Sequence, residues 1–309
     1  MSHLTFAEAT VVGLIQGVTE LFPVSSLGHN VLIPALVGGS WARDLNVSKP
    51  ESPYLAFIVG LHVATALAMI IYFWRDWLRI ITGFLTSLRD RRVATADQRL
   101  AWLIILATIP VGIAGLALEH LFRVVFSKPV PTALFLAANG VVLLVGEYRR
   151  RRGGAARGEQ DGAEDESREV GTEQAIAADQ RLATMGIGKA VLIGASQIFA
   201  LLPGISRDGI VTVTGMFRGI SRQDAVRFSF LLSAPVILAA GALKIPDLTG
   251  PLGAGIGGQI LAGSLLSFVG AYLSVRFLTR YFAKARSLIP FGVYCLAAGL
   301  ISVAYLLLR

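Results

Sequence analysis

Polar side chains that can do chemistry are concentrated in one short stretch of an otherwise apolar N-terminal region. Gln16 and Glu20 are four residues apart, so they share one face of a helix. Ser26 and His29 are three residues apart and share a face of the next helix, which begins after a proline. Ser25 or Ser26 is a natural N-cap for that second helix. Because polar groups inside an apolar segment are costly, these residues are candidates for function.

A second polar stretch lies in the other half of the chain. Residues 203–209 read Pro-Gly-Ile-Ser-Arg-Asp-Gly, and Thr212 follows them. Arg207 is permanently charged, and its planar fork of donors suits phosphate oxygens. Ser206 can cap the helix that begins here, and Gly204 allows the backbone to approach a ligand closely.

Both stretches place a helix N-terminus beside a break in an apolar segment. Free backbone amides and the positive end of the helix dipole make such a terminus suitable for an anion. If the two breaks meet, they form a site for a phosphate or pyrophosphate headgroup, and the surrounding apolar wall suits a lipid tail.

These residues resemble the bacterial undecaprenyl-diphosphatase family of the bacitracin-resistance type. The resemblance rests on Gln16-x-x-x-Glu20 with residues 23–29 (Pro-Val-Ser-Ser-Leu-Gly-His), and on Pro-Gly-x-Ser-Arg at 203–207. The stretches 228–235 and 289–291 also resemble the family, so the similarity covers nearly the whole chain apart from residues 153–181.

The resemblance implies hydrolysis of undecaprenyl diphosphate to undecaprenyl phosphate and phosphate, which recycles the lipid carrier of peptidoglycan and other wall polymers. It implies that Glu20, His29 and Arg207 are functional, with Ser25, Ser26 and Ser206 beside them. It also implies an active site on the outer side of the bacterial plasma membrane. A divalent cation, Mg²⁺ or Ca²⁺, is expected at the first motif, with Glu20 and Gln16 as the candidate ligands.

Three positions depart from the family pattern. Gln16 stands where many members have Glu, which halves the local negative charge. Asp208 replaces the second serine of Ser-Arg-Ser, and Val211 stands at the position of a threonine, next to Thr212. Two roles for Asp208 stay open: an ion pair with Arg207, or replacement of the carboxylate that is missing at Gln16.

The sequence leaves the nucleophile open. His29 could attack phosphorus or act as base or acid, Ser26 is the rival nucleophile, and Glu20 is the preferred base or metal ligand. Gln16, Ser25, Gly204, Ser206, Asp208 and Thr212 are the candidate substrate-binding residues. His62 and Asn139 are expected to pack or to form hydrogen bonds between helices.

Composition agrees with a membrane protein. Of the 309 residues, 54% are hydrophobic and 16% are charged, whereas soluble domains have about 25% charged residues. The apolar content suffices for about eight segments of the length that crosses a bilayer. A single cysteine excludes an internal disulfide framework, and the net charge of +8 is attributed to cytoplasmic loops, not to nucleic-acid binding.

The apolar segments predict an all-α polytopic membrane protein with six full spans and two re-entrant helical hairpins. Residues 21–26 align without a gap with residues 201–206, and three long apolar segments follow each of these breaks. This pattern predicts two inverted halves in one membrane domain, 1–309, with the broken helices at a binding site near the midplane. The first half, 1–147, contains the hairpin 4–38, and the second, 186–309, contains the hairpin 186–217.

Arginine-rich loops predict the orientation. The segments 75–99, 148–185, 218–227 and 276–287 are assigned to the cytoplasm, and the connector 246–254, which lacks Lys and Arg, is assigned to the outside. Residues 148–185 are interpreted as a partly disordered linker, because 153–181 are polar and acidic.

Two rival functions belong to other classes. Inverted halves are also typical of transporters, so a lipid-phosphate transporter or flippase with weak or no phosphatase activity is the first alternative. A structural partner of wall-synthesis enzymes is the second. The lipid substrate and the bilayer are the expected partners, nucleic acid is not, and a second copy of the chain in a homodimer is a further candidate.

Overall fold

The computed structural model describes residues 4–45, 53–121, 128–157, 172–243, 255–284 and 286–308. Within these ranges the regular elements are all helices, as the sequence predicts. In chain order they are α1 (Phe6–Leu21), α2 (Ser26–Val37), α3 (Gly39–Asp44), α4 (Pro53–Tyr72), α5 (Trp74–Asp90), α6 (Ala96–Leu121), α7 (Pro129–Arg157), α8 (Thr172–Ala183), α9 (Ile187–Ala195), the 3₁₀ helix η2 (Ser196–Leu201), α10 (Arg207–Phe217), α11 (Arg222–Leu243), α13 (Gly257–Ala283) and α14 (Ile289–Leu308).

Five helices are long and apolar enough to cross a membrane by themselves: α6, α7, α11, α13 and α14. The sixth predicted span, α4, forms a bent pair with α5 at an angle of 86°. In contrast, α1 and α2 contain only 16 and 12 residues, fewer than the roughly 20 that a full crossing needs. The described chain is therefore a polytopic membrane protein with short, broken helices among its spans.

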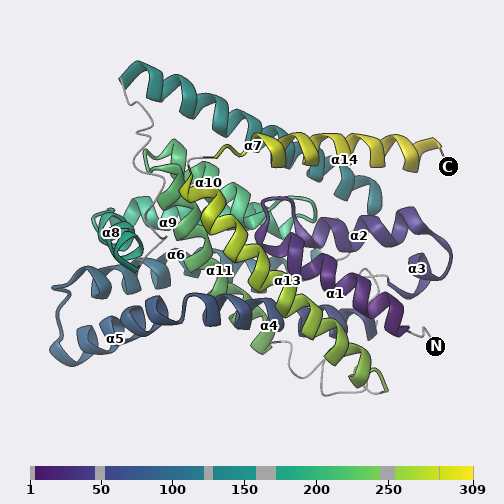
Figure 1. Ribbon diagram of the computed structural model, residues 1–309, viewed down its shortest axis with the longest axis horizontal. Coiled ribbons are helices and arrows are strands. Elements are labelled where there is room, and N and C mark those ends of the chain that lie inside the picture. The colour runs from purple at the N-terminus through teal and green to yellow at the C-terminus, as the bar shows by residue number, and fades with distance from the viewer. Residues whose placement is uncertain are drawn as a thin grey trace.

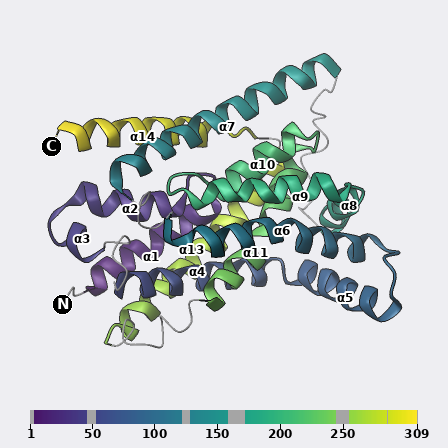
Figure 2. The same cartoon turned by 180° about the vertical axis from the view of Figure 1, so that it is seen from behind.

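The arginine-rich helices gather at one end of the molecule. Figures 1 and 2 show α5, α8 and the C-terminal part of α7 at one end, whereas α1 begins and α14 finishes at the opposite end. The arginine-rich segments at this end are the ones that the sequence predicts to lie in the cytoplasm. The connector 246–254 and residues 158–171 of the linker lie outside the described residues.

Each short hairpin packs against a long helix of the other half of the chain. Helix α1 packs along α13, and α9 packs along α6 (Figures 1 and 2). Gly17 of α1 faces the backbone of Ser267, and Gly194 of α9 faces the backbone of Ala107. Small residues let the helix backbones approach closely, which is how helices associate inside a bilayer.

Two helices differ from the sequence prediction. Helix α5 lies in the segment interpreted as a cytoplasmic loop, 75–99, where the arginines lower the mean hydropathy. It is amphipathic, with Ile80 and Gly83 buried and Leu78 and Leu85 exposed. Prediction by hydropathy alone finds apolar spans and misses such a helix.

The second difference is α8, which occupies the end of the segment interpreted as a solvated linker. Buried Asp179 accepts hydrogen bonds from Arg79 at 2.7 Å and from Arg227 at 2.7 and 2.9 Å. Arg181 forms a two-pronged ion pair with Asp224 of α11 at 2.6 and 2.8 Å. These tertiary ion pairs hold α8 in place together with its buried apolar residues Leu182 and Ala183.

Candidate active site

The two breaks in the helices touch each other at the centre of the molecule. Ser25 caps α2, and its Oγ accepts hydrogen bonds from the backbone amides of Gly28 at 3.2 Å and of Gly204, in the other break, at 3.1 Å. Gly204 has a φ of 111° and faces the backbone of α7, so a side chain there would be strained and would clash. The Ser25 hydroxyl and Gly204 thus join the two breaks, as the sequence predicted that the breaks would meet.

Asn139 of α7 forms hydrogen bonds to both breaks. Its Nδ2 donates to the carbonyl oxygen of Pro23 at 3.0 Å, and its Oδ1 accepts from the amide of Ser206 at 3.0 Å. Asn139 is fully buried. The sequence prediction of a hydrogen bond between helices is correct, but it did not place Asn139 at the site.

Ser206 caps α10 as predicted. Its Oγ accepts a hydrogen bond from the amide of Gly209 at 3.2 Å. Both predicted caps are therefore confirmed, and α2 and α10 begin beside each other.

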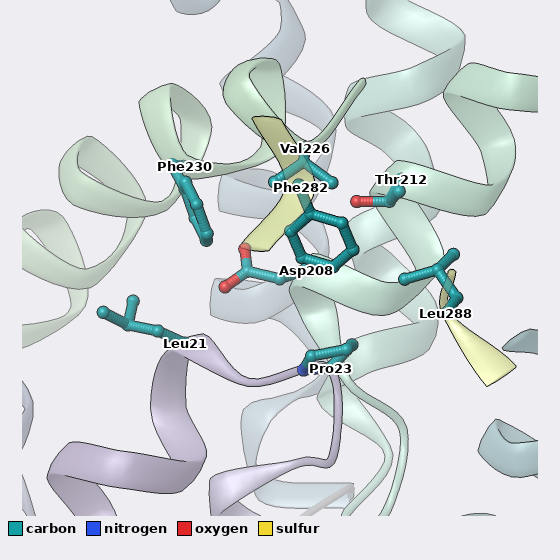
Figure 3. A pocket seen from close by; sticks show the side chains of 8 residues that line it. All are labelled: Leu21, Pro23, Asp208, Thr212, Val226, Phe230, Phe282 and Leu288. Atoms are coloured by element: carbon teal, nitrogen blue, oxygen red, sulfur yellow. The ribbon is translucent and has the colours of Figure 1, made fainter. Parts of the chain in front are cut away.

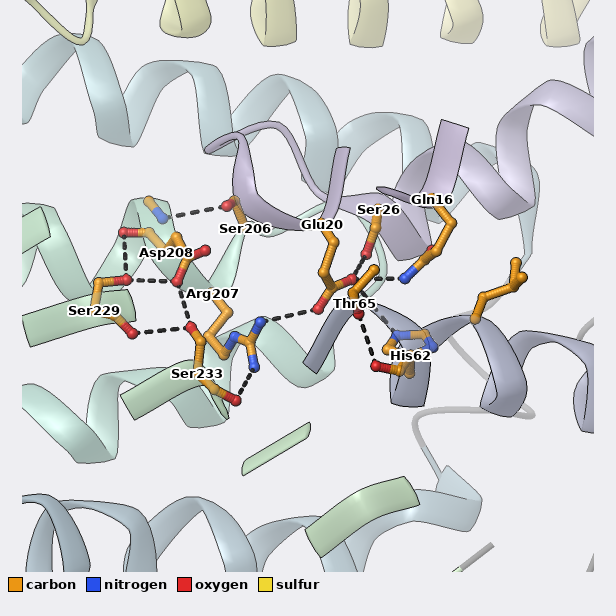
Figure 4. Close-up of polar contacts among 12 residues, drawn as sticks. Gln16, Glu20, Ser26, His62, Thr65, Ser206, Arg207, Asp208, Ser229 and Ser233 are labelled. Carbon is orange, nitrogen blue, oxygen red and sulfur yellow. Dashed lines mark hydrogen bonds and ion pairs between the residues drawn. The ribbon is translucent and has the colours of Figure 1, made fainter. Parts of the chain in front are cut away.

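The carboxylate of Glu20 is the centre of the polar cluster (Figure 4). Its Oε1 accepts from Arg207 Nη2 at 2.9 Å, and its Oε2 accepts from Gln16 Nε2 at 2.8 Å and from the hydroxyl of Ser26. His62 Nε2 of α4 lies 3.6 Å from the same Oε2. An amide, a hydroxyl, a guanidinium and an imidazole thus surround one buried carboxylate.

His29 does not belong to this cluster of hydrogen bonds. Its Nδ1 lies 2.7 Å from the carbonyl oxygen of Ser25, and its Nε2 lies 2.7 Å from the hydroxyl of Tyr294 on α14, against whose ring it stacks. The imidazole beside Glu20 is that of His62, which the sequence predicted to pack or to form a hydrogen bond between helices, but not to lie at the site. A histidine inside the apolar segment 54–74 was the available signal.

Asp208 takes neither of the two roles that the sequence left open. Its Oδ1 accepts from the hydroxyls of Ser229 at 2.5 Å and Ser233 at 2.6 Å, both on α11. In the described chain, the ion pair of Arg207 is with Glu20 and not with Asp208. Ser229 and Ser233 lie in the stretch 228–235, but nothing in their spacing identified them as partners of Asp208.

Asp208 and Thr212 line a small cavity beside the first break, whose Leu21 and Pro23 also line it (Figure 3). The other lining side chains are apolar: Leu21, Pro23, Val226, Phe230, Phe282 and Leu288. Asp208 and Thr212 are only 4% and 2% exposed. Both predicted substrate-binding residues therefore face this apolar cavity and not the group around Glu20.

The residues of the first motif do not fit a resident divalent cation. Gln16 turns its amide nitrogen toward Glu20, and its Oε1 accepts from Asn30 Nδ2 at 2.6 Å. Over the part of the chain that the structure describes, there is no group of three or more His, Cys, Asp or Glu side chains that could hold a metal ion. Mg²⁺ and Ca²⁺ need several oxygen ligands, and here the only charged oxygens are those of Glu20.

Residues 9–301 match the family model described as bacitracin resistance protein BacA. The chain belongs to the BacA family. A protein of Mycolicibacterium paratuberculosis named undecaprenyl-diphosphatase is 62% identical over 308 residues, covering 100% of this chain and 99% of that protein. A protein of the same name from Mycobacterium avium is 61% identical with the same coverage. Undecaprenyl-diphosphatase 1 of Frankia casuarinae is 48% identical, covering 98% of each chain.

The BacA match spans both breaks, the whole second hairpin and all but the first residues of the first hairpin. The sequence-based recognition of this family is therefore confirmed. The cluster around Glu20 is built from Gln16, Ser26, His62 and Arg207, which all lie within the matched range.

Proposed function

We propose that this chain is a membrane phosphatase that hydrolyses undecaprenyl diphosphate to undecaprenyl phosphate and phosphate, and thereby recycles the lipid carrier of peptidoglycan. One observation carries the proposal: the Glu20 carboxylate joins the Ser26 hydroxyl on one side and the Arg207 guanidinium on the other. A base, a hydroxyl nucleophile and a phosphate-binding cation are the parts that phosphoryl transfer requires. The curated relatives named undecaprenyl-diphosphatase support the same substrate.

Arg207 binds the diphosphate in this proposal. Its fork of donors matches phosphate oxygens and neutralises the charge that develops on the departing lipid phosphate. The amides at the start of α2 and α10 add to the positive potential around the same group.

Ser26 is the proposed nucleophile. Its hydroxyl proton passes to Glu20 while Oγ forms a bond to the terminal phosphorus, and the bond between that phosphorus and the bridging oxygen breaks. Undecaprenyl phosphate leaves with the electron pair of that bond. Water then attacks the phosphoserine, Glu20 returns its proton to the Ser26 oxygen, and the two protons of the water leave with the phosphate as dihydrogen phosphate.

His29 has a supporting role in this mechanism. Its two ring nitrogens lie at hydrogen-bond distance from the Ser25 carbonyl and the Tyr294 hydroxyl. The turn that presents Ser26 is strained, because Ser25 has a φ of 68°. In the proposed mechanism, the contacts of His29 hold this turn in place.

Orientation and assembly are further parts of the proposal. The site faces the outer side of the bacterial plasma membrane, since the arginine-rich segments are expected in the cytoplasm. Assembly of the chain as a homodimer is also part of the proposal. Labelling of a single introduced cysteine from each side of the membrane tests the first statement, and the mass of the purified protein in detergent tests the second.

The central test measures phosphate release from undecaprenyl diphosphate by the purified protein. Replacing Arg207 with Ala should lower kcat/KM by about 10²–10³-fold, as removal of a transition-state donor does elsewhere. Ser302→Ala, a buried serine on α14, is the matched control and should keep both its activity and its melting temperature. Near-normal release by folded Arg207→Ala contradicts the proposal, and movement of lipid phosphate across vesicles without any hydrolysis supports the transporter instead.

A further inference from the structure

Asp208 is a buried acid that the proposed mechanism does not use. It follows Arg207 in the first turn of α10, yet it is only 4% exposed and its carboxylate bonds to α11. Over the described residues, its second oxygen, Oδ2, has no hydrogen-bond partner, and Asp208 lines the apolar cavity of Figure 3. A buried carboxylate costs stability unless its contacts compensate for the lost hydration. The presence of a carboxylate at this buried position therefore needs an explanation.

The same turn of α11 that holds Asp208 also holds Arg207. Ser233 donates its hydroxyl to Asp208 Oδ1 at 2.6 Å, and its backbone carbonyl accepts from Arg207 Nη1 at 3.3 Å (Figure 4). Ser229, one turn earlier, gives Asp208 a second hydroxyl contact at 2.5 Å. Arg207 and Asp208 of α10 thus both form hydrogen bonds to the same turn of α11.

This arrangement decides where the guanidinium points. One nitrogen of Arg207 bonds to the Ser233 carbonyl and another bonds to Glu20 Oε1 at 2.9 Å. A long arginine side chain has many rotamers, and a group that binds a transition state must be held close to its productive position. If α10 turned or slid relative to α11, the Ser233 carbonyl and the Glu20 carboxylate would no longer both be within reach.

We propose that Asp208, Ser229 and Ser233 form a positioning cluster that aims Arg207 at the diphosphate. The inference rests on the proposed function only in that Arg207 binds the diphosphate. Asp208 itself touches neither the substrate nor Glu20. Ser233 is central, because its hydroxyl fixes Asp208 while its carbonyl fixes Arg207.

The test compares Asp208→Ala with Asp208→Asn. The amide oxygen of Asn can still accept both serine hydroxyls, so Asp208→Asn should keep kcat and KM within about threefold of the wild type. Asp208→Ala loses both hydrogen bonds. It should raise KM and lower kcat by about tenfold each, in the range expected when a bond to a charged group is lost. A purely structural role lowers the active fraction and leaves KM unchanged. The rise in KM and its rescue by Asn therefore distinguish positioning from folding.

The serines provide an independent check. Each single change, Ser229→Ala or Ser233→Ala, leaves Asp208 one hydroxyl, so the double variant should lose far more activity than either single variant. Adding Asp208→Ala to the double variant should cost nothing further, because residues that act as a unit are not additive. Independent losses that multiply in the triple variant would overturn the cluster.

A binding measurement separates this inference from the proposed function. Inorganic pyrophosphate should raise the melting temperature of the wild-type protein, and Asp208→Ala should need about tenfold more pyrophosphate for the same shift, as the loss of a charged contact predicts. If the wild type hydrolyses no lipid diphosphate but the pyrophosphate shift depends on Asp208, the proposed function fails and the cluster stands. If Asp208→Ala matches the wild type in KM and in its response to pyrophosphate, the cluster is wrong whatever the activity.

Discussion

The carboxylate of Glu20 and the guanidinium of Arg207 form an ion pair at 2.9 Å, although they are 187 residues apart in the chain. Their side chains are only 7% and 14% exposed. Each neutralises the other where an unpaired charge is costly. In the proposed mechanism, a diphosphate that binds Arg207 frees one oxygen of Glu20, so we expect the carboxylate to become a better acceptor for the Ser26 proton.

The first prediction concerns Glu20→Gln. The amide keeps the shape of the carboxylate, and its one oxygen can still accept hydrogen bonds, but it cannot take the Ser26 proton. We expect kcat to fall by about 10²–10⁴-fold, the usual contribution of a general base, while KM stays the same or falls because Arg207 loses its competing partner. Steady-state phosphate release measures both constants. An unchanged kcat would mean that Glu20 is not the base.

The second prediction separates the two adjacent serines. Ser26 donates to Glu20, whereas the Ser25 oxygen accepts from two backbone amides. We expect Ser26→Ala to remove a phosphoenzyme that can be trapped by acid quenching of ³²P-labelled substrate. Ser25→Ala should lower stability by about 1 kcal/mol, as the loss of a cap does, and should still form the phosphoenzyme. Label that persists in Ser26→Ala would exclude this serine as the nucleophile.

The third prediction concerns the divalent cation. Gln16 donates to Glu20 in this chain, so the first motif carries one negative charge and offers no set of ligands for a metal ion. Gln16→Glu places two carboxylates side by side, and one bound Mg²⁺ or Ca²⁺ would relieve their repulsion. Phosphate release in a chelator titration should therefore depend more steeply on the cation in Gln16→Glu than in the wild type. Equal dependence in both proteins would show that residue 16 has no part in metal binding.

The fourth prediction distinguishes the two histidines. His62 lies 3.6 Å from Glu20 Oε2, whereas His29 contacts Tyr294 on the far side of α2. We expect His62→Gln to lower kcat/KM by about tenfold, comparable to the loss of a hydrogen bond to a charged group. Tyr294→Phe removes only the outer partner of His29 and should stay within about threefold of the wild type. The reverse order of effects would place the functional imidazole on α2.

Local rules made part of this site predictable. Proline stops a helix, serine caps the next one, and both rules apply at residues 23–26 and 203–206. They predicted the two breaks and the capping serines, because each depends only on neighbours in the chain. The meeting of the two breaks followed instead from the similarity of the two halves.

Tertiary packing decides what the sequence did not show. The partner of Glu20 is His62 and not His29 because α4 presents its imidazole toward α1, whereas α2 turns His29 toward α14. The rotation of each helix about its axis depends on contacts with other helices, which spacing within one helix does not determine. The same holds for Asp208, whose partners lie 21 and 25 residues further along the chain.

The fifth prediction tests the packing that carries Glu20. A Cβ added at Gly17 would lie 2.9 Å from both Cα and the carbonyl carbon of Ser267, so α1 and α13 must move apart in Gly17→Ala. Overpacking of this kind costs about 1–3 kcal/mol, and because Glu20 lies one turn further along α1, activity should fall as well. Gly112→Ala on α6 is the matched control, since a Cβ there meets nothing within 4 Å. Melting temperature in detergent and phosphate release should both drop for Gly17→Ala and stay unchanged for Gly112→Ala; equal behaviour of the two variants would show that close contact between α1 and α13 does not set the position of the carboxylate.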